Sequence, residues 1–250
     1  MQANLLQYAA MKKIFQHLLK QFNRELRVVD SPTRSFSRAV ELLKPLIAPK
    51  TIIDIGVADG TPDLYRHFPT HPYLLIEANP IYQATLNQLQ TQINAIVEPV
   101  FCGAEPGEVQ LNSYEDPRKS SRFATTRALT IEQQVIVPVA TLDSLIAKHE
   151  LNGPFLLKID VEGAEIDVLK GATKTLQTCE AVIAEASVLP KYVGGPELAD
   201  LVKLMDELGF AVFDIAAGSN IPNKAILYQV DLVFVKKEAP FRHQPIGGGK

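Results

Sequence analysis

The sequence has few of the residues that disulfide-rich and metal-binding proteins need. Only two of its 250 residues are cysteines, Cys102 and Cys179, and they do not form a C-x-x-C motif. This argues against a disulfide framework or a thiolate metal site, and it fits a reducing compartment. The five histidines lack metal-ligand spacing, so we expect each of them to be structural or solvated.

Long apolar runs and a strong net charge are also missing. No apolar run approaches the length needed to cross a bilayer, and Lys12 and Lys13 interrupt the apolar positions near the start, so we expect no transmembrane segment and no signal peptide. The net charge of −3 argues against a dedicated nucleic-acid binder. The hydrophobic fraction of 46% is that of an ordinary globular protein. We therefore expect a cytoplasmic α/β protein without a nucleic-acid partner.

Residues 51–60, TIIDIGVADG, predict a buried strand followed by a glycine turn. A short apolar run of this kind is typical of the first strand of an α/β sheet. Gly56 can adopt backbone angles closed to other residues and lets a ligand approach the main chain. Thr61 and Pro62 predict a helix directly after the loop, with Thr61 as its N-cap. This order forms the nucleotide crevice of doubly wound folds, although the G-x-x-x-G spacing disfavours NAD and FAD.

A second strand, predicted at residues 73–76 (YLLI), ends at an acidic residue. Glu77 lies 21 positions after Gly56, the distance at which an acid at the tip of the second strand meets the two hydroxyls of a ribose. Taken alone, Glu77 is equally well a solvated residue at the end of an ordinary strand. Together with the glycine loop it favours a cofactor of the adenosine type. Asn79 and Pro80 then predict the start of a helix that reaches about position 92.

Residues 155–159, FLLKI, predict a central strand that contains a lysine and is followed by three acids within six residues. Lys158 and Asp160 lie on one face of this strand because the side chains alternate. Buried charges need partners, so this cluster, which includes Glu162, is either a structural ion-pair network or the reacting end of a site. Open α/β sheets bind ligands at the carboxyl ends of their strands, which favours a site.

The remaining pattern predicts alternating strands and helices in one domain at residues 50–237. Further strands are expected at residues 95–102, 108–113, 135–139, 181–186, 210–215 and 231–235, and further helices at residues 141–150 and 197–208. A polar loop at residues 114–130 is long enough to be functional. Residues 238–250 are expected to form a flexible tail.

Residues 1–49 predict a helical extension that carries an excess of basic residues. An amphipathic helix is expected at residues 5–26 and a second one at residues 35–43, limited by Pro45. We expect these helices to cap the cofactor cleft or to form a homodimer. The alternative is a basic arm that contacts a membrane surface or an anionic substrate.

These motifs resemble those of the FkbM family of S-adenosylmethionine-dependent methyltransferases. IDIGVADG is similar to the first motif of that family, and IEANP is similar to its acidic second motif. TLDSL followed by LLKIDVEGAEIDVLKGA is the most specific part of the resemblance, which covers roughly residues 50–237. It implies a Rossmann-like class I methyltransferase fold, with a seven-stranded, mostly parallel sheet, helices on both faces, and a last strand antiparallel to its neighbours.

The resemblance also implies which residues hold the cofactor. They are Asp54, Gly56 and Gly60 around the methionine part, Glu77 at the ribose hydroxyls with Ala78 and Asn79 beside it, and Cys102 and Gly103 at the adenine. Asp160 and Glu162 would face the methyl group and the acceptor.

Two positions depart from the family pattern. Where such loops often read G-A-N-x-G, this sequence has Val57, Ala58 and Asp59 between the glycines, which puts a carboxylate where an amide is common. Glu105 stands where the family has a short Asp ending after the third strand. The first change alters hydrogen bonding in the loop, and the second weakens the expected adenine contacts.

Methyl transfer from a sulfonium is an in-line displacement, so positioning of acceptor and methyl supplies much of the catalysis. An alcohol acceptor must also lose a proton, and we expect Asp160 to accept it, with Glu162 as the second candidate and Glu185 as the third. The alternative for Glu162 and Glu185 is a structural role, paired with Lys158 or capping local backbone. Carboxylate-bound Mg²⁺ is compatible with these oxygen ligands, but their spacing does not establish it.

We therefore predict an S-adenosylmethionine-dependent O-methyltransferase that acts on a hydroxyl of a sugar, a glycan or a secondary metabolite. Two alternatives stay open. One is a catalytically silent binding or scaffold protein with the same fold. The other is an NAD-dependent oxidoreductase, which the spacing of the glycines disfavours.

Overall fold

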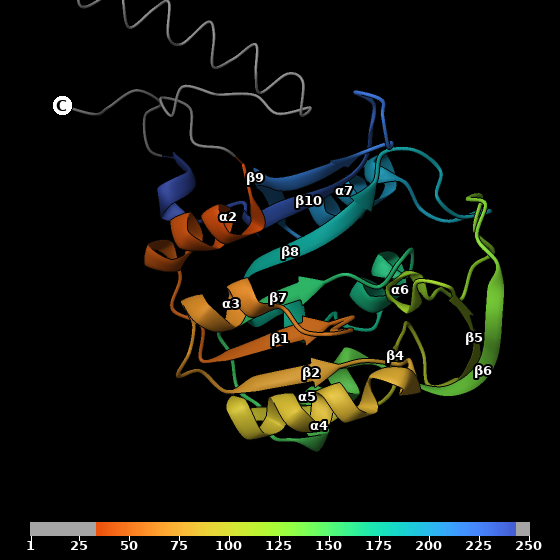
Figure 1. Ribbon diagram of the computed structural model, residues 1–250. Coiled ribbons are helices and arrows are strands. Elements are labelled where there is room, and N and C mark those ends of the chain that lie inside the picture. Colours follow the sequence, from red (N-terminus) through yellow and green to blue (C-terminus); the bar gives the residue numbers. More distant parts are fainter. Residues whose placement is uncertain (1–33, 244–250) are drawn as a thin grey trace, which may run out of the picture. The chain divides into compact units, whose positions relative to one another are not determined.

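The computed structural model describes residues 34–243, and its centre is a seven-stranded sheet of order β3-β2-β1-β7-β8-β10-β9 (Figure 1). The strands are β1 (Thr51–Ile55), β2 (Tyr73–Ile76), β3 (Ala95–Glu98), β7 (Phe155–Ile159), β8 (Cys179–Ser187), β9 (Phe210–Asn220) and β10 (Leu227–Lys236). In this order, β3, β2, β1, β7 and β8 pair in parallel, whereas β10 runs antiparallel to both β8 and β9. The predicted sheet, with its last strand reversed, is confirmed.

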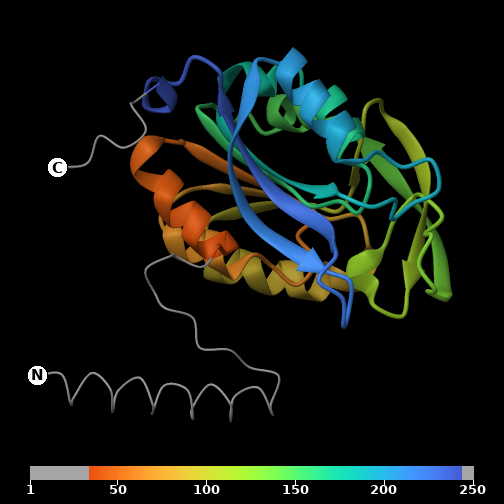
Figure 2. The same ribbon diagram turned by 90° about the horizontal axis from the view of Figure 1, so that it is seen from above.

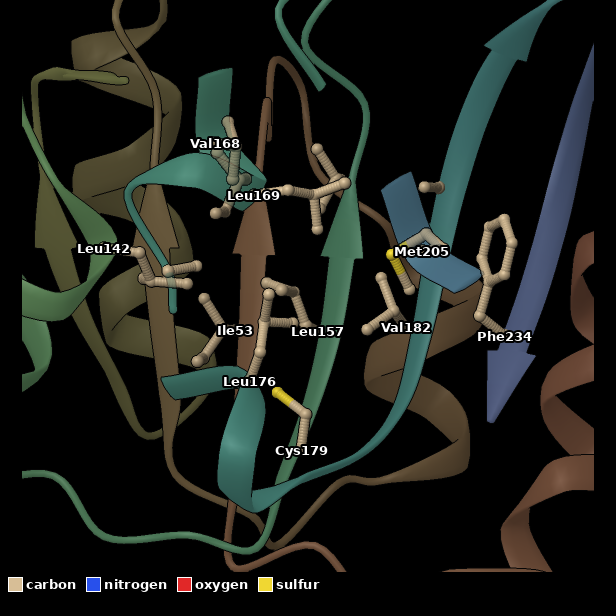
Figure 3. Packing of buried hydrophobic residues seen from close by; sticks show 14 of the residues in the cluster. Ile53, Leu142, Leu157, Val168, Leu169, Leu176, Cys179, Val182, Met205 and Phe234 are labelled. Atoms are coloured by element: carbon tan, nitrogen blue, oxygen red, sulfur yellow. The ribbon is translucent and has the colours of Figure 1, made fainter. Parts of the chain in front are cut away.

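Successive residues of the central strands enter two apolar cores on opposite faces of the sheet. Ile53 and Leu74 belong to one core, while their chain neighbours Ile52 and Leu75 belong to the other, as the alternation of side chains along a strand requires. The first core lies under α5 (Leu142–Lys148), α6 (Glu165–Lys170) and α7 (Leu198–Glu207), as Figure 3 shows. The second lies under α2 (Phe36–Leu43), α3 (Pro62–His67) and α4 (Gln83–Gln92). Figure 2 shows the helices on both sides of the sheet.

The helix expected at residues 35–43 is confirmed as α2. The Ser35 hydroxyl oxygen accepts a hydrogen bond from the backbone N–H of Arg38 at 3.2 Å, which caps the helix. Pro45 lies in the short 3₁₀ helix η1 (Lys44–Leu46) that follows. The helix expected at residues 5–26 and positions 244–250 of the expected tail lie outside the described residues.

The strand expected at residues 95–102 is wrong as a single element. Proline has no N–H to donate to a ladder, and at Pro99 the chain leaves β3 and enters a second sheet as β4 (Phe101–Cys102). That sheet also contains β5 (Gly107–Tyr114) and β6 (Ile131–Ala140), in the order β4-β6-β5. Figure 1 shows the small sheet beyond the carboxyl ends of β1, β2 and β7. It therefore forms a wall at the edge where a ligand is expected.

The turns contain short 3₁₀ helices, namely η2 (Pro80–Tyr82), η3 (Pro117–Lys119), η4 (Thr175–Thr178) and η5 (Pro240–His243). One expected cap is absent, because the Thr61 side chain makes no capping hydrogen bond at the start of α3. Asn79 does cap η2, since its side-chain oxygen accepts from the Ile81 N–H at 3.1 Å. Pro80 follows it as the first residue of η2.

Gly171 ends α6 at a point where two segments of backbone touch. A Cβ atom added to Gly171 would lie 2.1 Å from the carbonyl oxygen of Gly103. That oxygen belongs to the main chain and not to the end of a flexible side chain, so moving it would require a shift of the backbone.

Gly171→Ala should lower the free energy of unfolding by about 1–3 kcal/mol, the usual range for overpacking. Gly107→Ala is the matched control, because a Cβ there meets nothing within 4 Å, and its effect should stay within about 0.5 kcal/mol. Urea unfolding of both variants measures the difference, and equal stabilities would contradict the close contact.

Candidate active site

The site begins at a buried ion pair between the two central strands. Asp54 on β1 is opposite Lys158 on β7 in the parallel register, and the Lys158 Nζ atom lies 3.2 Å from Asp54 Oδ1. The Tyr65 hydroxyl of α3 donates to Asp54 Oδ2 at 2.9 Å. Burial disfavours the ammonium of Lys158, but the charges of Asp54 and Asp160 outweigh this and raise the pKa of Lys158.

The same ammonium holds the glycine loop that follows β1. Lys158 Nζ donates to the carbonyl oxygen of Gly56 at 3.2 Å. Gly56 has a φ of +76°, and a Cβ at this position would lie 1.7 Å from the backbone oxygen of Asp160. Only glycine therefore lets the loop after β1 lie against the segment after β7. The Asp160 N–H, which donates to Ile55 at 3.0 Å, continues this contact.

Glu77 fastens the loops that follow β1 and β2 to each other. Its carboxylate accepts from the backbone N–H of Ala58 at 2.9 Å and from that of Asn79 at 2.7 Å. Burial raises the pKa of Glu77, and these two hydrogen bonds oppose that increase. The acid is therefore placed at the tip of the second strand, where the sequence predicts it.

Asn79 connects this region to the segment after β5. Its side-chain nitrogen donates to the hydroxyls of Ser113 and Ser120, at 3.3 and 2.9 Å, and its side-chain oxygen caps η2. All of its polar side-chain atoms thus serve the protein itself. Asn79 lies beside Glu77 as expected, and its side chain is used in positioning the wall of the cleft.

A cleft with two connected parts lies along these loops. The first part is lined by Glu77, Ala78, Tyr82, Cys102, Leu111 and Ser120, among others. The second part, of about 370 Å³, is lined by Gly60, Lys158, Glu185 and Asp231, among others. Five residues line both parts: Gly56, Ala58, Arg118, Asp160 and Glu162. Of the residues that the sequence singles out, Asp54, Asn79 and Gly103 are not in this lining; the Gly103 N–H donates to the Ala140 carbonyl at 3.0 Å.

Glu162 and Glu185 share a buried lysine that the sequence analysis did not identify. Lys191 Nζ lies 3.0 Å from Glu162 Oε2 and forms a second ion pair with Glu185. The Tyr192 hydroxyl donates to Glu162, and Arg127 lies 3.5 Å from the same carboxylate. Both acids therefore form structural ion pairs, which is the alternative role expected for them, but their partner is Lys191 instead of Lys158. A lysine next to Pro190, in the loop between β8 and α7, carries no local signal of this role.

Asp231 is a further acid of the cleft that the sequence analysis did not single out as a site residue. It lies opposite Glu185 in the antiparallel pairing of β10 with β8, and no residue among 34–243 forms an ion pair or a hydrogen bond with its side chain. Burial, followed by the charge of Asp160, raises the pKa of Asp231 to about 6, while Lys158 and Lys191 act in the opposite direction. The sequence did not indicate this role, because Asp231 lies inside a predicted strand and only the order of the strands in the sheet brings it to the cleft.

The cysteines and the histidines within residues 34–243 add no reactive group to the cleft. Burial raises the pKa of Cys102 to about 12, so its thiol stays protonated, and both cysteines are free and buried. Within residues 34–243, no group of three or more His, Cys, Asp or Glu side chains is arranged to hold a metal ion.

None of the helices in that part of the chain has the length and apolar character of a membrane span.

Comparison with known proteins identifies the sequence family. The model of the methyltransferase FkbM domain matches residues 54–212. The hexuronic acid methyltransferase AglP of Haloferax volcanii is 36% identical over 84 residues, which are 33% of this chain and 32% of that relative. The alignment thus spans about a third of the length of that curated relative.

Solved structures of methyltransferases are similar at a low level. Precorrin-6y C5,15-methyltransferase from Geobacter metallireducens has a TM-score of 0.42 and 10% identity, covering 80% of this chain and 87% of that one. Magnesium protoporphyrin IX methyltransferase from Synechocystis, solved with bound SAM, has a TM-score of 0.42 and 11% identity, covering 80% and 79%.

Lys191→Met should lower the free energy of unfolding by about 3–5 kcal/mol, because it leaves the buried carboxylate of Glu185 without its cation and removes the nearer of the two cations at Glu162. Lys203→Met on the exposed face of α7 is the matched control and should change stability by less than about 0.5 kcal/mol. Urea unfolding near neutral pH measures both, and a loss below about 1 kcal/mol for Lys191→Met would show that the acids do not depend on this lysine.

Asp231→Asn should change the pH dependence of stability. The folded-state pKa of Asp231, about 6, lies above the ordinary value of 3.8, so folding favours its protonated form. The wild-type protein therefore loses stability as the pH rises through this interval, whereas asparagine cannot ionise. The advantage of the variant over the wild type should grow by about 1–2 kcal/mol between about pH 4 and about pH 8. Denaturant unfolding at both pH values measures it, and a constant difference would contradict the raised pKa.

Proposed function

The chain belongs to the FkbM methyltransferase family, and we propose that it transfers a methyl group from S-adenosylmethionine to a hydroxyl of a sugar, a glycan or a secondary metabolite. The observation that carries the proposal is the joining of Gly56, Glu77 and Asp160 around one cleft at the carboxyl ends of β1, β2 and β7. The local similarity to a hexuronic acid methyltransferase supports a sugar as the acceptor.

The residues of the cleft suit the cofactor. Gly56 and Gly60 both line the cleft beside the loop after β1, where the methionine part would lie. Glu77 uses one lone pair on each oxygen for backbone N–H groups, so further lone pairs are left to accept from ribose hydroxyls. Phe101 and Leu111 provide apolar surface for the adenine.

The same geometry ranks the acids that would accept the proton of the acceptor. Glu162 and Glu185 are both bound to Lys191, so their carboxylates are engaged within the protein. Burial raises the pKa of Glu185, and Lys191 acts in the opposite direction. Asp160 has a side chain that is 43% exposed and lies 3.5 Å from Lys158, a longer contact. We therefore assign proton removal to Asp160, with Asp231, which forms no ion pair or hydrogen bond with residues 34–243, as the second candidate.

The mechanism that follows divides the work between two groups of residues. Bound S-adenosylmethionine supplies an electrophilic methyl group. Asp160 accepts the hydroxyl proton of the acceptor, while the loop after β1 and Glu77 hold the reactants in line. The ion pairs of Lys191 with Glu162 and Glu185 hold the neighbouring wall of the cleft in place. The cytoplasmic location expected from the sequence is part of this proposal.

Binding of S-adenosylhomocysteine tests the cofactor site. Glu77→Gln removes one charge-assisted acceptor and should weaken binding about 10–100-fold. Glu115→Gln, an exposed acid between β5 and η3, is the matched control and should bind like the wild type. Calorimetry measures both, with NAD as a second ligand. Binding of NAD in place of S-adenosylhomocysteine would support an oxidoreductase instead.

The scaffold alternative requires a second experiment. The protein is incubated with S-adenosylmethionine and either glucuronic acid, glucose or their oligosaccharides, and the products are examined by mass spectrometry for an added methyl group. A methylated product supports the proposed activity. Tight S-adenosylhomocysteine binding without transfer to any of these acceptors would favour a silent binding protein or a different acceptor class.

A further inference from the structure

Tyr82 has a buried hydroxyl without a hydrogen-bond partner in the part of the chain that the structure describes. The residue ends η2, two positions after Pro80, and lines the part of the cleft that contains Glu77. Its side chain is 9% exposed. The hydroxyl oxygen is shielded from solvent and meets no donor or acceptor among residues 34–243.

The other buried tyrosines do not share this feature. Tyr65 donates to Asp54 at 2.9 Å, Tyr73 donates to the carbonyl of Phe68 at 2.9 Å, and Tyr192 donates to Glu162. A buried hydroxyl without a partner costs about 1–3 kcal/mol. A group that is kept at such a cost, at the wall of a binding cleft, indicates a partner that arrives with the ligand.

The surroundings of Tyr82 keep its hydroxyl protonated. Burial raises the pKa of Tyr82 to about 12, and the nearby charges of Glu77, Asp59 and Asp116 act in the same direction. Arg118 opposes them. At neutral pH the phenol is therefore a hydrogen-bond donor placed close to the carboxylate of Glu77.

A ribose hydroxyl needs a donor in addition to the acceptor that Glu77 provides. Each such hydroxyl donates one hydrogen bond and accepts others, whereas an ionised carboxylate only accepts. Two neighbouring donor side chains are engaged within the protein, Arg118 through two of its five N–H groups. Arg118 binds Asp116 at 2.9 and 3.3 Å, and the Ser120 hydroxyl donates to the Pro117 carbonyl at 2.6 Å.

We propose that the Tyr82 hydroxyl donates to a ribose hydroxyl of the bound cofactor, which in turn donates to Glu77. This inference rests on the proposed function and names a ribose-recognition residue of the same site. A chain of this kind makes the phenol useful only when the contacted sugar hydroxyl is present, because a sugar that lacks it has no oxygen at that position to accept. Tyr82 thereby contributes to selection of a ribonucleoside cofactor.

The test is a binding cycle that removes the hydroxyl from either side. The protein variants are the wild type and Tyr82→Phe, and the ligands are S-adenosylhomocysteine and its 2′-deoxy and 3′-deoxy analogues, all measured by calorimetry. Tyr82→Phe should weaken S-adenosylhomocysteine binding about 3–10-fold. With the analogue that lacks the contacted hydroxyl, both proteins should bind equally. Tyr114→Phe is the matched control, since Tyr114 is buried and donates to the Phe123 carbonyl at 3.4 Å.

Stability without ligand gives an independent readout of opposite sign. Tyr82→Phe should be at least as stable as the wild type, because the lost hydroxyl has no partner in the protein. Tyr73→Phe should instead lose stability, because it breaks the bond to Phe68. Urea unfolding compares the two variants.

Three results would overturn the inference. Equal S-adenosylhomocysteine binding by the wild type and Tyr82→Phe would remove Tyr82 from the site and leave the proposed function intact. A loss of stability in Tyr82→Phe as large as that in Tyr73→Phe would show that the hydroxyl is bonded within the protein. No binding by the folded wild type would overturn the proposed function together with this inference.

Discussion

The site depends on the buried pair of Asp54 and Lys158. Two charges in the interior of a sheet carry a large desolvation penalty, which good geometry and additional hydrogen bonds must offset. Here the Tyr65 hydroxyl donates to one carboxylate oxygen of Asp54. Lys158 also donates to the Gly56 carbonyl and forms an ion pair with Asp160. The partners that make the pair tolerable are the glycine loop and the segment after β7. The contacts that stabilise the two charges are therefore the same contacts that shape the cleft.

A second lysine organises the other side of the cleft in the same way. Lys191 joins Glu162 to Glu185, and the loop between β5 and β6 reaches this cluster through Arg127. Each lysine thus binds two carboxylates from different segments. With Glu162 and Glu185 held by Lys191, we propose Asp160, whose side chain is 43% exposed, and Asp231 as the carboxylates that meet an acceptor.

The sequence predicted features that depend on local pattern. The strand before Gly56 and the acid at the end of β2 each follow from alternation, spacing and turn residues within a short window. Asp231 could not be predicted this way, because it reaches the cleft only through the pairing of β10 with β8, after the chain has passed through α7 and β9. Lys191 lies in the loop after β8, and it meets Glu162 because β7 and β8 are neighbours in the sheet. The break at Pro99 was readable in principle, since proline cannot continue a ladder, but an apolar run on both sides of it concealed the end of the strand.

The charges of the cleft also bear on how the proposed sugar acceptor would lie. Carboxylates only accept hydrogen bonds, so Asp160 and Asp231 suit hydroxyl groups that donate. A carboxylate carried by the acceptor would meet like charge at this point, and burial strengthens that repulsion. An acidic sugar therefore has to present a hydroxyl to the acids and keep its own carboxylate elsewhere, which restricts the hydroxyls that can reach the methyl group. The acids that would remove the proton in this way also limit the position of methylation.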